Sequence, residues 1–200
     1  MRRFARGARR YLRNALLLLL VGVLAGACNG TPTEEELQAL FDRGEHLCLE
    51  QNWLEARATL RQYLLHDPTN AGAHFYLGRA YLFARDFRPA IAEGELQLAL
   101  TLYVEDGRGE SPIERYGKDY FEMTCSLESA KVCIRQIDFL RSLQVPRDAT
   151  RPIFERGRDY IEAGRAVMPN ADDVRVVEGL LQAAQHGPAR PLPQSEPGSV

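Results

Sequence analysis

The sequence predicts an all-α protein, a solenoid of antiparallel helix pairs with about seven or eight helices after an N-terminal leader. Apolar residues recur at helical spacing through the middle of the chain, and the alternation typical of strands is absent. Four residues have counterparts 34 positions further on: Gly44, Asn52, Trp53 and Ala56 match Gly78, Asp86, Phe87 and Ala90. Such a period indicates one helical unit used twice, and each unit must stack on a neighbour to bury its apolar face.

Residues 1–27 have the features of a secretory signal peptide. Residues 1–14 contain six arginines and no acidic residue, and the apolar run that follows, residues 15–27, is 13 residues long. A membrane-spanning helix needs about 20 apolar residues, so a signal peptide is the better interpretation. Cys28 follows Ala25, Gly26 and Ala27 and resembles the lipidated cysteine of bacterial lipoproteins, although that family prefers leucine where Ala25 stands. The resemblance implies cleavage before Cys28 and a lipid on it; ordinary cleavage or a retained short anchor is the alternative.

Loss of the leader would leave 19 basic and 27 acidic residues, a net charge of about −8. This acidic balance argues against binding to nucleic acid, and against binding to an anionic bilayer through charge alone. Membrane contact would instead come from the lipid on Cys28.

The mature chain is predicted to begin with the lipidated cysteine and a short tether, residues 28–33. Thr33 and Glu36 form a capping box that starts the first helix, and Asn70 can cap a later one. Residues 34–104 hold two helical units, 37–70 and 71–104, and residues 105–186 are expected to form divergent helical hairpins. The first of these is a pair that begins near residue 116 and is ended by residues 146–150, followed by helices at 153–167 and 172–185. Residues 187–200 contain four prolines and read as a disordered tail.

The two units resemble the tetratricopeptide repeat. The family's small, large, aromatic and proline positions are filled in the first unit by Gly44, Leu47, Trp53, Ala56 and Pro68. The second unit supplies Gly78, Tyr81, Phe87 and Ala90, with Leu102 where proline is usual. Small residues let the two helices of a unit cross closely. The resemblance covers residues 37–104 and implies that the solenoid is right-handed.

In that family the first helices of successive units line a concave groove. The resemblance assigns to this groove Gln38, Phe41, Glu45, Leu49, Phe75, Arg79, Leu82 and Phe83. Phe41 and Glu45 replace residues of the family's best-known carboxylate clamp, so a peptide with apolar anchors is the better fit. The alternative is that Phe75, Leu82 and Phe83 pack against the helices that follow.

Catalytic chemistry finds little support in the sequence. The four histidines are not spaced as metal ligands on one helix face, and neither a nucleophile motif nor a phosphate-binding loop is present. We therefore expect no enzymatic activity, no metal and no cofactor.

Three cysteines follow Cys28. Cys48 lies on an apolar helix face and is expected to be a small buried hydrophobe. Cys125 and Cys133 could form a disulfide only across a turn, because eight residues of continuous helix span about 12 Å. Three free thiols are the alternative.

Together these features predict a lipid-anchored periplasmic scaffold on the inner face of the outer membrane. It would bind a partner protein or peptide of the cell envelope, and assembly of an outer-membrane complex is the analogous role in other repeat lipoproteins. The alternative is a self-associating structural lipoprotein without a peptide groove.

Overall fold

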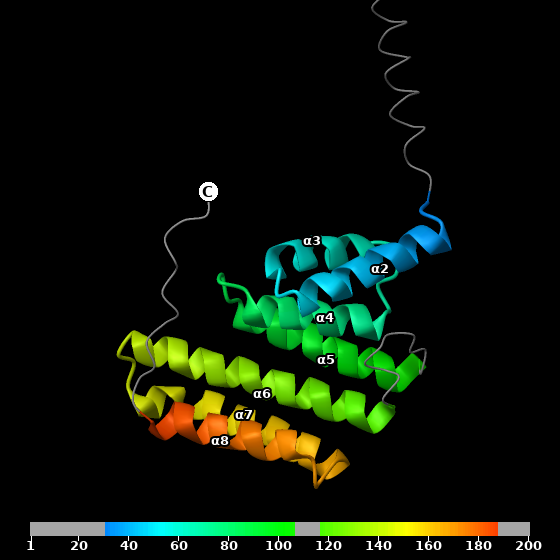
Figure 1. The fold of residues 1–200 in the computed structure, drawn as a ribbon. Helices are drawn as coiled ribbons and strands as arrows, with labels where there is room; N and C mark the ends of the chain where they lie inside the picture. The colour runs from blue at the N-terminus through cyan, green and yellow to red at the C-terminus, as the bar shows by residue number, and fades with distance from the viewer. Residues whose placement is uncertain (1–30, 107–116, 188–200) are drawn as a thin grey trace, which may run out of the picture. The chain divides into compact units, whose positions relative to one another are not determined.

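The computed structural model of the protein describes residues 31–106 and 117–187, and these residues form helices and no strand. The helices are α2 (Glu34–Leu49), α3 (Trp53–Leu64), α4 (Ala71–Phe83), α5 (Pro89–Asp106), α6 (Lys118–Ser142), α7 (Arg147–Val167) and α8 (Asp172–His186) (Figure 1). The all-α class is confirmed for this part of the chain. The expected signal peptide, Cys28 and all but the first residue of the expected tail lie outside the described residues.

The chain divides into two compact units, Met1–Leu37 and Gln38–Val200, and the boundary falls inside α2. The described part of the first unit contains the start of α2. There the Glu36 N–H donates to Thr33 Oγ1 over 3.2 Å, and the Thr33 N–H donates to Glu36 Oε2 over 2.8 Å. The capping box is thus confirmed. Everything described below belongs to the second unit.

Helices that follow one another in the sequence are neighbours in the second unit. Each of α3 to α7 packs on the next helix, and α6 also contacts α4 and α8 (Figure 1). The part of α2 after Gln38 joins this array through Phe41, whose ring centroid lies 5.5 Å from that of Tyr63 and 6.2 Å from that of Tyr76. Asn70 caps α4, since its side chain accepts from the Ala73 N–H over 2.8 Å, as expected.

The helical pair expected between residue 116 and residues 146–150 is wrong, because α6 runs unbroken for 25 residues from Lys118 to Ser142. No glycine or proline lies between these two residues, so nothing in the sequence ends a helix there. The helix is buried along most of its length, from Phe121 to Ile137. This length allows α6 to contact α4 and α5 as well as α7 and α8.

The two glycines of the 34-residue period occupy equivalent places in α2 and α4. A Cβ on Gly44 would lie 2.6 Å from Cδ2 of Leu60, and a Cβ on Gly78 would lie 2.7 Å from Cγ of Leu96. Both leucines are fully buried. Each glycine therefore admits a leucine of the next helix at a distance that no other residue would allow.

The period changes to 36 residues in the second helix of each unit. Ala56 and Leu60 of α3 are completely buried, and the buried counterparts in α5 are Ala92 and Leu96. The extra two residues lie in the turn, which spans 84–88 before α5 but only 50–52 before α3. The assignment of Ala90 as a packing residue is thus wrong. Its side chain is exposed, because the longer turn shifts the apolar face of α5 by two positions.

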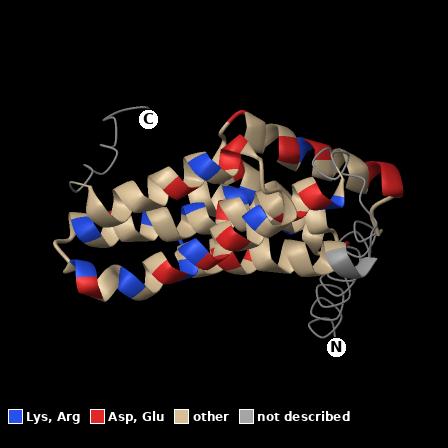
Figure 2. Cartoon of the chain, turned by 90° about the horizontal axis from the view of Figure 1, so that it is seen from below, with Lys and Arg blue, Asp and Glu red and all other residues tan. Residues whose placement is uncertain are grey.

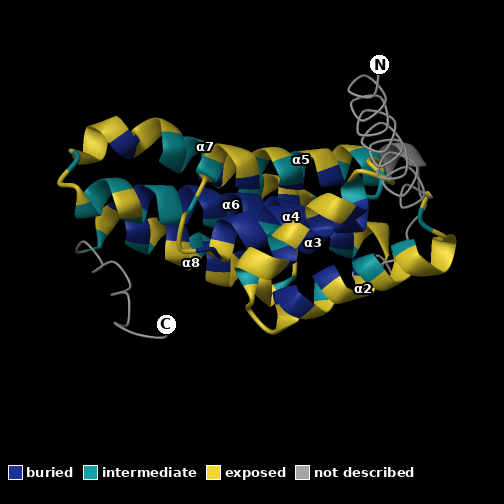
Figure 3. Cartoon of the chain, turned by 90° about the horizontal axis from the view of Figure 1, so that it is seen from above, coloured by how far each residue is buried: buried dark blue, intermediate teal, exposed yellow. Residues whose placement is uncertain are grey.

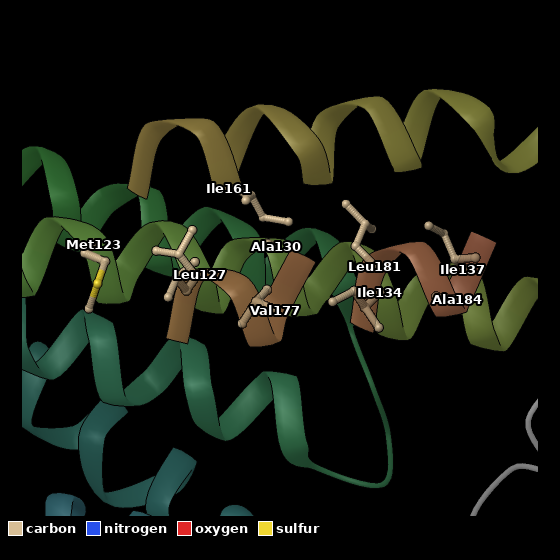
Figure 4. Close-up of a cluster of buried hydrophobic side chains, with 10 residues drawn as sticks. Met123, Leu127, Ala130, Ile134, Ile137, Ile161, Val177, Leu181 and Ala184 are labelled. Carbon is tan, nitrogen blue, oxygen red and sulfur yellow. The ribbon is translucent and has the colours of Figure 1, made fainter. Parts of the chain in front are cut away.

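The last three helices share one apolar core. Ile161 of α7 and Leu181 of α8 point toward α6 from two sides (Figure 4). The cluster consists of Met123, Leu127, Ala130, Ile134, Ile137, Ile161, Val174, Val177, Leu181 and Ala184. In the other half of the unit, α4 is buried over nearly its whole length (Figure 3).

Two arginines of α6 hold the ends of neighbouring helices. Arg135 donates to the carbonyl oxygens of Leu82 and Ala84 at the end of α4, the latter over 2.8 Å. Arg141 donates to those of Ala184 and Gly187 at the end of α8. Terminal carbonyls lack partners within their own helix, so these contacts satisfy them and fix α4 and α8 along α6.

Candidate protein-binding cleft

A cleft of about 290 Å³ lies between α4, α6 and α8, the helices that the two arginines hold together. Its lining residues are Phe75, Arg79, Tyr120, Met123, Thr124, Leu127, Glu128, Lys131, Asp173, Val176, Val177 and Leu180. We refer to it as the α4–α6–α8 cleft.

The apolar part of the cleft is continuous with the protein core. Met123, Leu127 and Val177 belong to the core cluster and are buried. Val176 and Leu180 of α8 are 59% and 36% exposed. The cleft therefore has a rigid apolar base and an aliphatic rim that is open to solvent, a combination found at protein-binding surfaces.

The polar part of the cleft centres on Glu128, whose side chain is only 6% exposed. Its Oε1 accepts from Lys131 Nζ over 2.9 Å and lies 3.8 Å from Arg79 Nε. Glu128 Oε2 and Arg79 Nε are buried and have no hydrogen-bond partner among the described residues. A buried polar group without a partner costs about 1–3 kcal/mol, so two of them beside one cleft carry a cost that a bound group would relieve if side chains moved to admit it.

Aromatic rings hold the Arg79 guanidinium over the cleft. Its carbon atom lies 5.8 Å from the ring centroids of both Phe75 and Phe83. Phe75 is 1% exposed and packs against Phe121 of α6, with 5.9 Å between the ring centroids. These contacts limit the movement of Arg79 and keep its charge beside Glu128.

Two of the eight expected groove residues, Phe75 and Arg79, line this cleft. Phe41 and Leu82 are 3% and 1% exposed, so their side chains are part of the core. For Phe75 the alternative interpretation from the sequence is the correct one, because its ring packs against Phe121 of the later helix α6. Phe83 is 38% exposed, and its ring centroid lies 5.2 Å from that of Trp53.

The expected groove residues of α2 do not line the cleft. Gln38 donates to Asp42 over 2.8 Å, and Leu49 is 65% exposed. Glu45 accepts from the Tyr76 hydroxyl over 2.7 Å. Burial and this hydrogen bond raise the pKa of Tyr76 above its usual range. The α2 residues thus lie outside the cleft that Arg79 and Glu128 line.

Of the other expected repeat residues, three make contacts that position neighbouring elements. The Pro68 carbonyl oxygen lies 2.9 Å from Nε2 of His74. Tyr81 is 8% exposed beneath the Arg57 guanidinium, and Phe87 lies in the turn before α5 beneath that of Arg135.

The disulfide that the sequence left possible between Cys125 and Cys133 is not formed. Cys48, Cys125 and Cys133 are buried and none of them is in a disulfide, and the last two lie on the continuous helix α6 without the turn that a bond would need. Burial raises the pKa of Cys48 to about 12 and that of Cys133 to about 11. Thiols of this kind are unreactive.

The described residues contain no group of His, Cys, Asp and Glu side chains that could hold a metal ion. Among residues 31–106 and 117–187, no helix is long and apolar enough to cross a membrane. Acidic and basic residues are interspersed along the helices seen in Figure 2. The cleft, rather than a surface of one charge, is the feature that distinguishes this part of the chain.

Sequence reasoning missed the α6 and α8 residues of the cleft. Glu128 lies seven positions after Phe121 and three after Cys125, which is helical spacing within an otherwise apolar face. A carboxylate at such a position is a detectable signal, since acidic residues are almost never buried without a partner. The α8 residues carried no comparable signal.

Comparison with protein-family models, curated proteins and solved structures finds no match to this chain. The site must therefore be interpreted from its own residues.

Proposed function

We propose that this protein is a scaffold that binds a partner protein or peptide in the α4–α6–α8 cleft. The observation that carries the proposal is the pairing of buried, unsatisfied polar atoms on Glu128 and Arg79 with the exposed aliphatic rim of Val176 and Leu180. Buried polar groups beside apolar anchors are typical of sites that select a partner.

We propose further that α2 to α5 are two units of a tetratricopeptide-like right-handed solenoid, and that Cys28 carries a lipid. Gly44 and Gly78, each packed on a leucine of the next helix, support the relation between the units. The basic leader, short apolar run and Cys28 support export and anchoring at the periplasmic face of the outer membrane. In this location the partner would be a protein of the cell envelope.

Self-association is the second candidate. Phe139 and Leu143, near the C-terminal end of α6, are 44% and 58% exposed and could meet a second copy. Light scattering on the purified chain separates the candidates, because a monomer has no such interface and a stable dimer requires one.

The proposal can be tested by site-specific photocrosslinking in the cells that make the protein. A photoreactive residue at Val176 lies on the rim of the cleft, and one at Leu65, 80% exposed and outside the cleft, is the matched control. We expect a protein adduct from position 176 that is absent from position 65. Identical adducts from both positions, or none from 176, would contradict binding in the cleft.

A further inference from the structure

Glu128 and Arg79 present complementary hydrogen-bonding needs in one small space. Glu128 Oε2 is an acceptor without a donor, and Arg79 Nε is a donor without an acceptor. The two side chains are already adjacent, with 3.8 Å between Arg79 Nε and Glu128 Oε1. A group that satisfies both must carry a donor and an acceptor side by side.

The charges around these atoms exclude an ionic ligand group. Glu128 already neighbours two cations, Arg79 and Lys131, so a third cation would meet repulsion. An anion would meet the buried carboxylate of Glu128 and the side chain of Asp173 at the same cleft. The favoured group is therefore neutral, since burying an unpaired charge is far more costly than burying an amide that keeps its hydrogen bonds.

The size of the cleft limits what can enter. Its volume of about 290 Å³ is at the lower end of the range for small-molecule sites. It suits one side chain better than a length of main chain. The N–H and C=O of a trans main-chain amide also point in opposite directions, whereas a primary carboxamide presents its NH₂ and C=O along one edge.

We propose that the cleft binds the side-chain carboxamide of a glutamine or asparagine in a partner peptide, an inference that rests on the proposed function. Both atoms are closed to solvent in the free protein, so a small movement of the side chains that cover them accompanies binding. The NH₂ group then donates to Glu128 Oε2, and the carbonyl oxygen accepts from Arg79 Nε. Apolar residues beside the carboxamide pack on the rim formed by Val176 and Leu180. The partner is thus a peptide with one amide side chain among apolar ones.

Selection from a library of short random peptides displayed on phage tests this proposal. The full chain, purified in detergent, serves as the immobilised target. The decisive variant is Glu128→Met, which removes the acceptor with little change of volume. Removing one partner of a buried ion pair is destabilising, so circular dichroism first checks that the variant is folded. Glu122→Met is the matched control, because Glu122 also lies in α6 but pairs with Lys118 and is not part of the cleft.

We expect the wild type and Glu122→Met to select peptides with a glutamine or asparagine beside apolar residues. Exchange of that glutamine for methionine should weaken binding to the wild type about tenfold, and should leave binding to Glu128→Met unchanged. If circular dichroism shows that Glu128→Met is unfolded, Arg79→Met takes its place with the same expected result, since the Arg79 side chain is 27% exposed.

The outcomes separate this inference from the proposed function. One outcome is that the selected peptides lack Asn and Gln and yet bind more weakly to Glu128→Met or Arg79→Met than to the wild type. That result would contradict recognition of a carboxamide but would still support peptide binding in the cleft. Failure of the wild type to select any peptide, or selection that neither variant affects, would overturn both.

Discussion

The side chain of His74 in α4 is hydrogen-bonded to that of Glu95 in α5, with 2.6 Å between His74 Nδ1 and Glu95 Oε2. The other ring nitrogen, Nε2, lies 2.9 Å from the Pro68 carbonyl oxygen. Both nitrogens face acceptors, so each must donate, and the ring is held as an imidazolium. One buried side chain thus ties together α4, α5 and the turn between α3 and α4.

This arrangement predicts a pH-dependent stability. Burial lowers the pKa of His74, but hydrogen bonds to Glu95 and Pro68 and the charges of Glu95 and Asp67 raise it, and the result lies above the ordinary 6.5. The unfolded chain lacks these partners. The stabilising contribution is therefore complete below about pH 6.5 and is lost as pH rises through the folded-state pKa.

Glu95→Gln should lower the free energy of unfolding by about 1.5–3 kcal/mol near pH 6, where the charged bond is intact. The difference from the wild type should shrink as the pH rises from about 6 through the folded-state pKa of His74, which lies above 6.5. Urea denaturation over this range measures it. Glu162→Gln, at an exposed carboxylate bonded to Arg165, is the control and should change stability by less than about 0.5 kcal/mol. Parallel curves for Glu95→Gln and the wild type would refute the charged histidine.

Two helical glycines should respond to alanine with opposite signs. A Cβ on Gly44 would lie 2.7 Å from Cγ of Leu60, a fully buried side chain that cannot move aside, so Gly44→Ala should cost about 1–3 kcal/mol. Gly94 lies inside α5 with nothing within 4 Å of its Cβ position. Gly94→Ala should therefore raise the free energy of unfolding by about 0.5–1 kcal/mol. Urea denaturation of the two variants measures the change in the free energy of unfolding. A change of the same sign in both would contradict the packing around Gly44 and Gly94.

The sequence was sufficient to predict the class of the fold and the ends of several helices. Helical periodicity and local capping, as at Thr33 and Asn70, depend on residues close in the chain. The offset of α5 could not be predicted, because Phe87 and Ala90 match the 34-residue period in residue type. Burial of Ala92 and Leu96 depends on the length of the preceding turn, which the period conceals.

The cleft was less accessible to prediction than the fold. Phe75 and Arg79 could be assigned from the repeat, since that helix keeps the 34-residue register. Glu128 and Val176 come from α6 and α8, which lie outside the recognisable repeat. Their approach to Arg79 depends on contacts across long sequence separations, such as those of Arg135 with Leu82 and of Arg141 with Ala184.

The 36-residue offset itself is testable by enlarging two alanines of α5. Ala92→Leu should lower the free energy of unfolding by about 1–3 kcal/mol or more, because Ala92 is completely buried beside Gly78. Ala90→Leu should change it by less than about 0.5 kcal/mol, because that side chain is exposed. Thermal or urea unfolding ranks the pair. A larger loss of stability for Ala90→Leu than for Ala92→Leu would contradict the 36-residue offset and support the 34-residue register in α5.

The buried thiols should not react with alkylating reagents in the native protein. In a Cys28→Ser background, Cys48, Cys125 and Cys133 should resist alkylation near neutral pH, because all three are buried and burial raises the pKa values of Cys48 and Cys133. All three should be alkylated once the unreduced protein is unfolded in denaturant. Mass spectrometry counts the modified thiols. Fewer than three after unfolding would reveal a disulfide that the structure does not contain.

Cys28→Ser also tests the proposed anchor. Without the thiol no lipid can be attached, so the protein should move from the membrane fraction to the soluble periplasmic fraction. Folding should be unchanged, since the core of α2 to α8 consists of residues after Gln38. Matched far-ultraviolet circular dichroism spectra would verify this. Retention of the variant on membranes would rule out a lipid on Cys28 as the anchor and favour the leader itself, kept as a short anchor, or a membrane-bound partner.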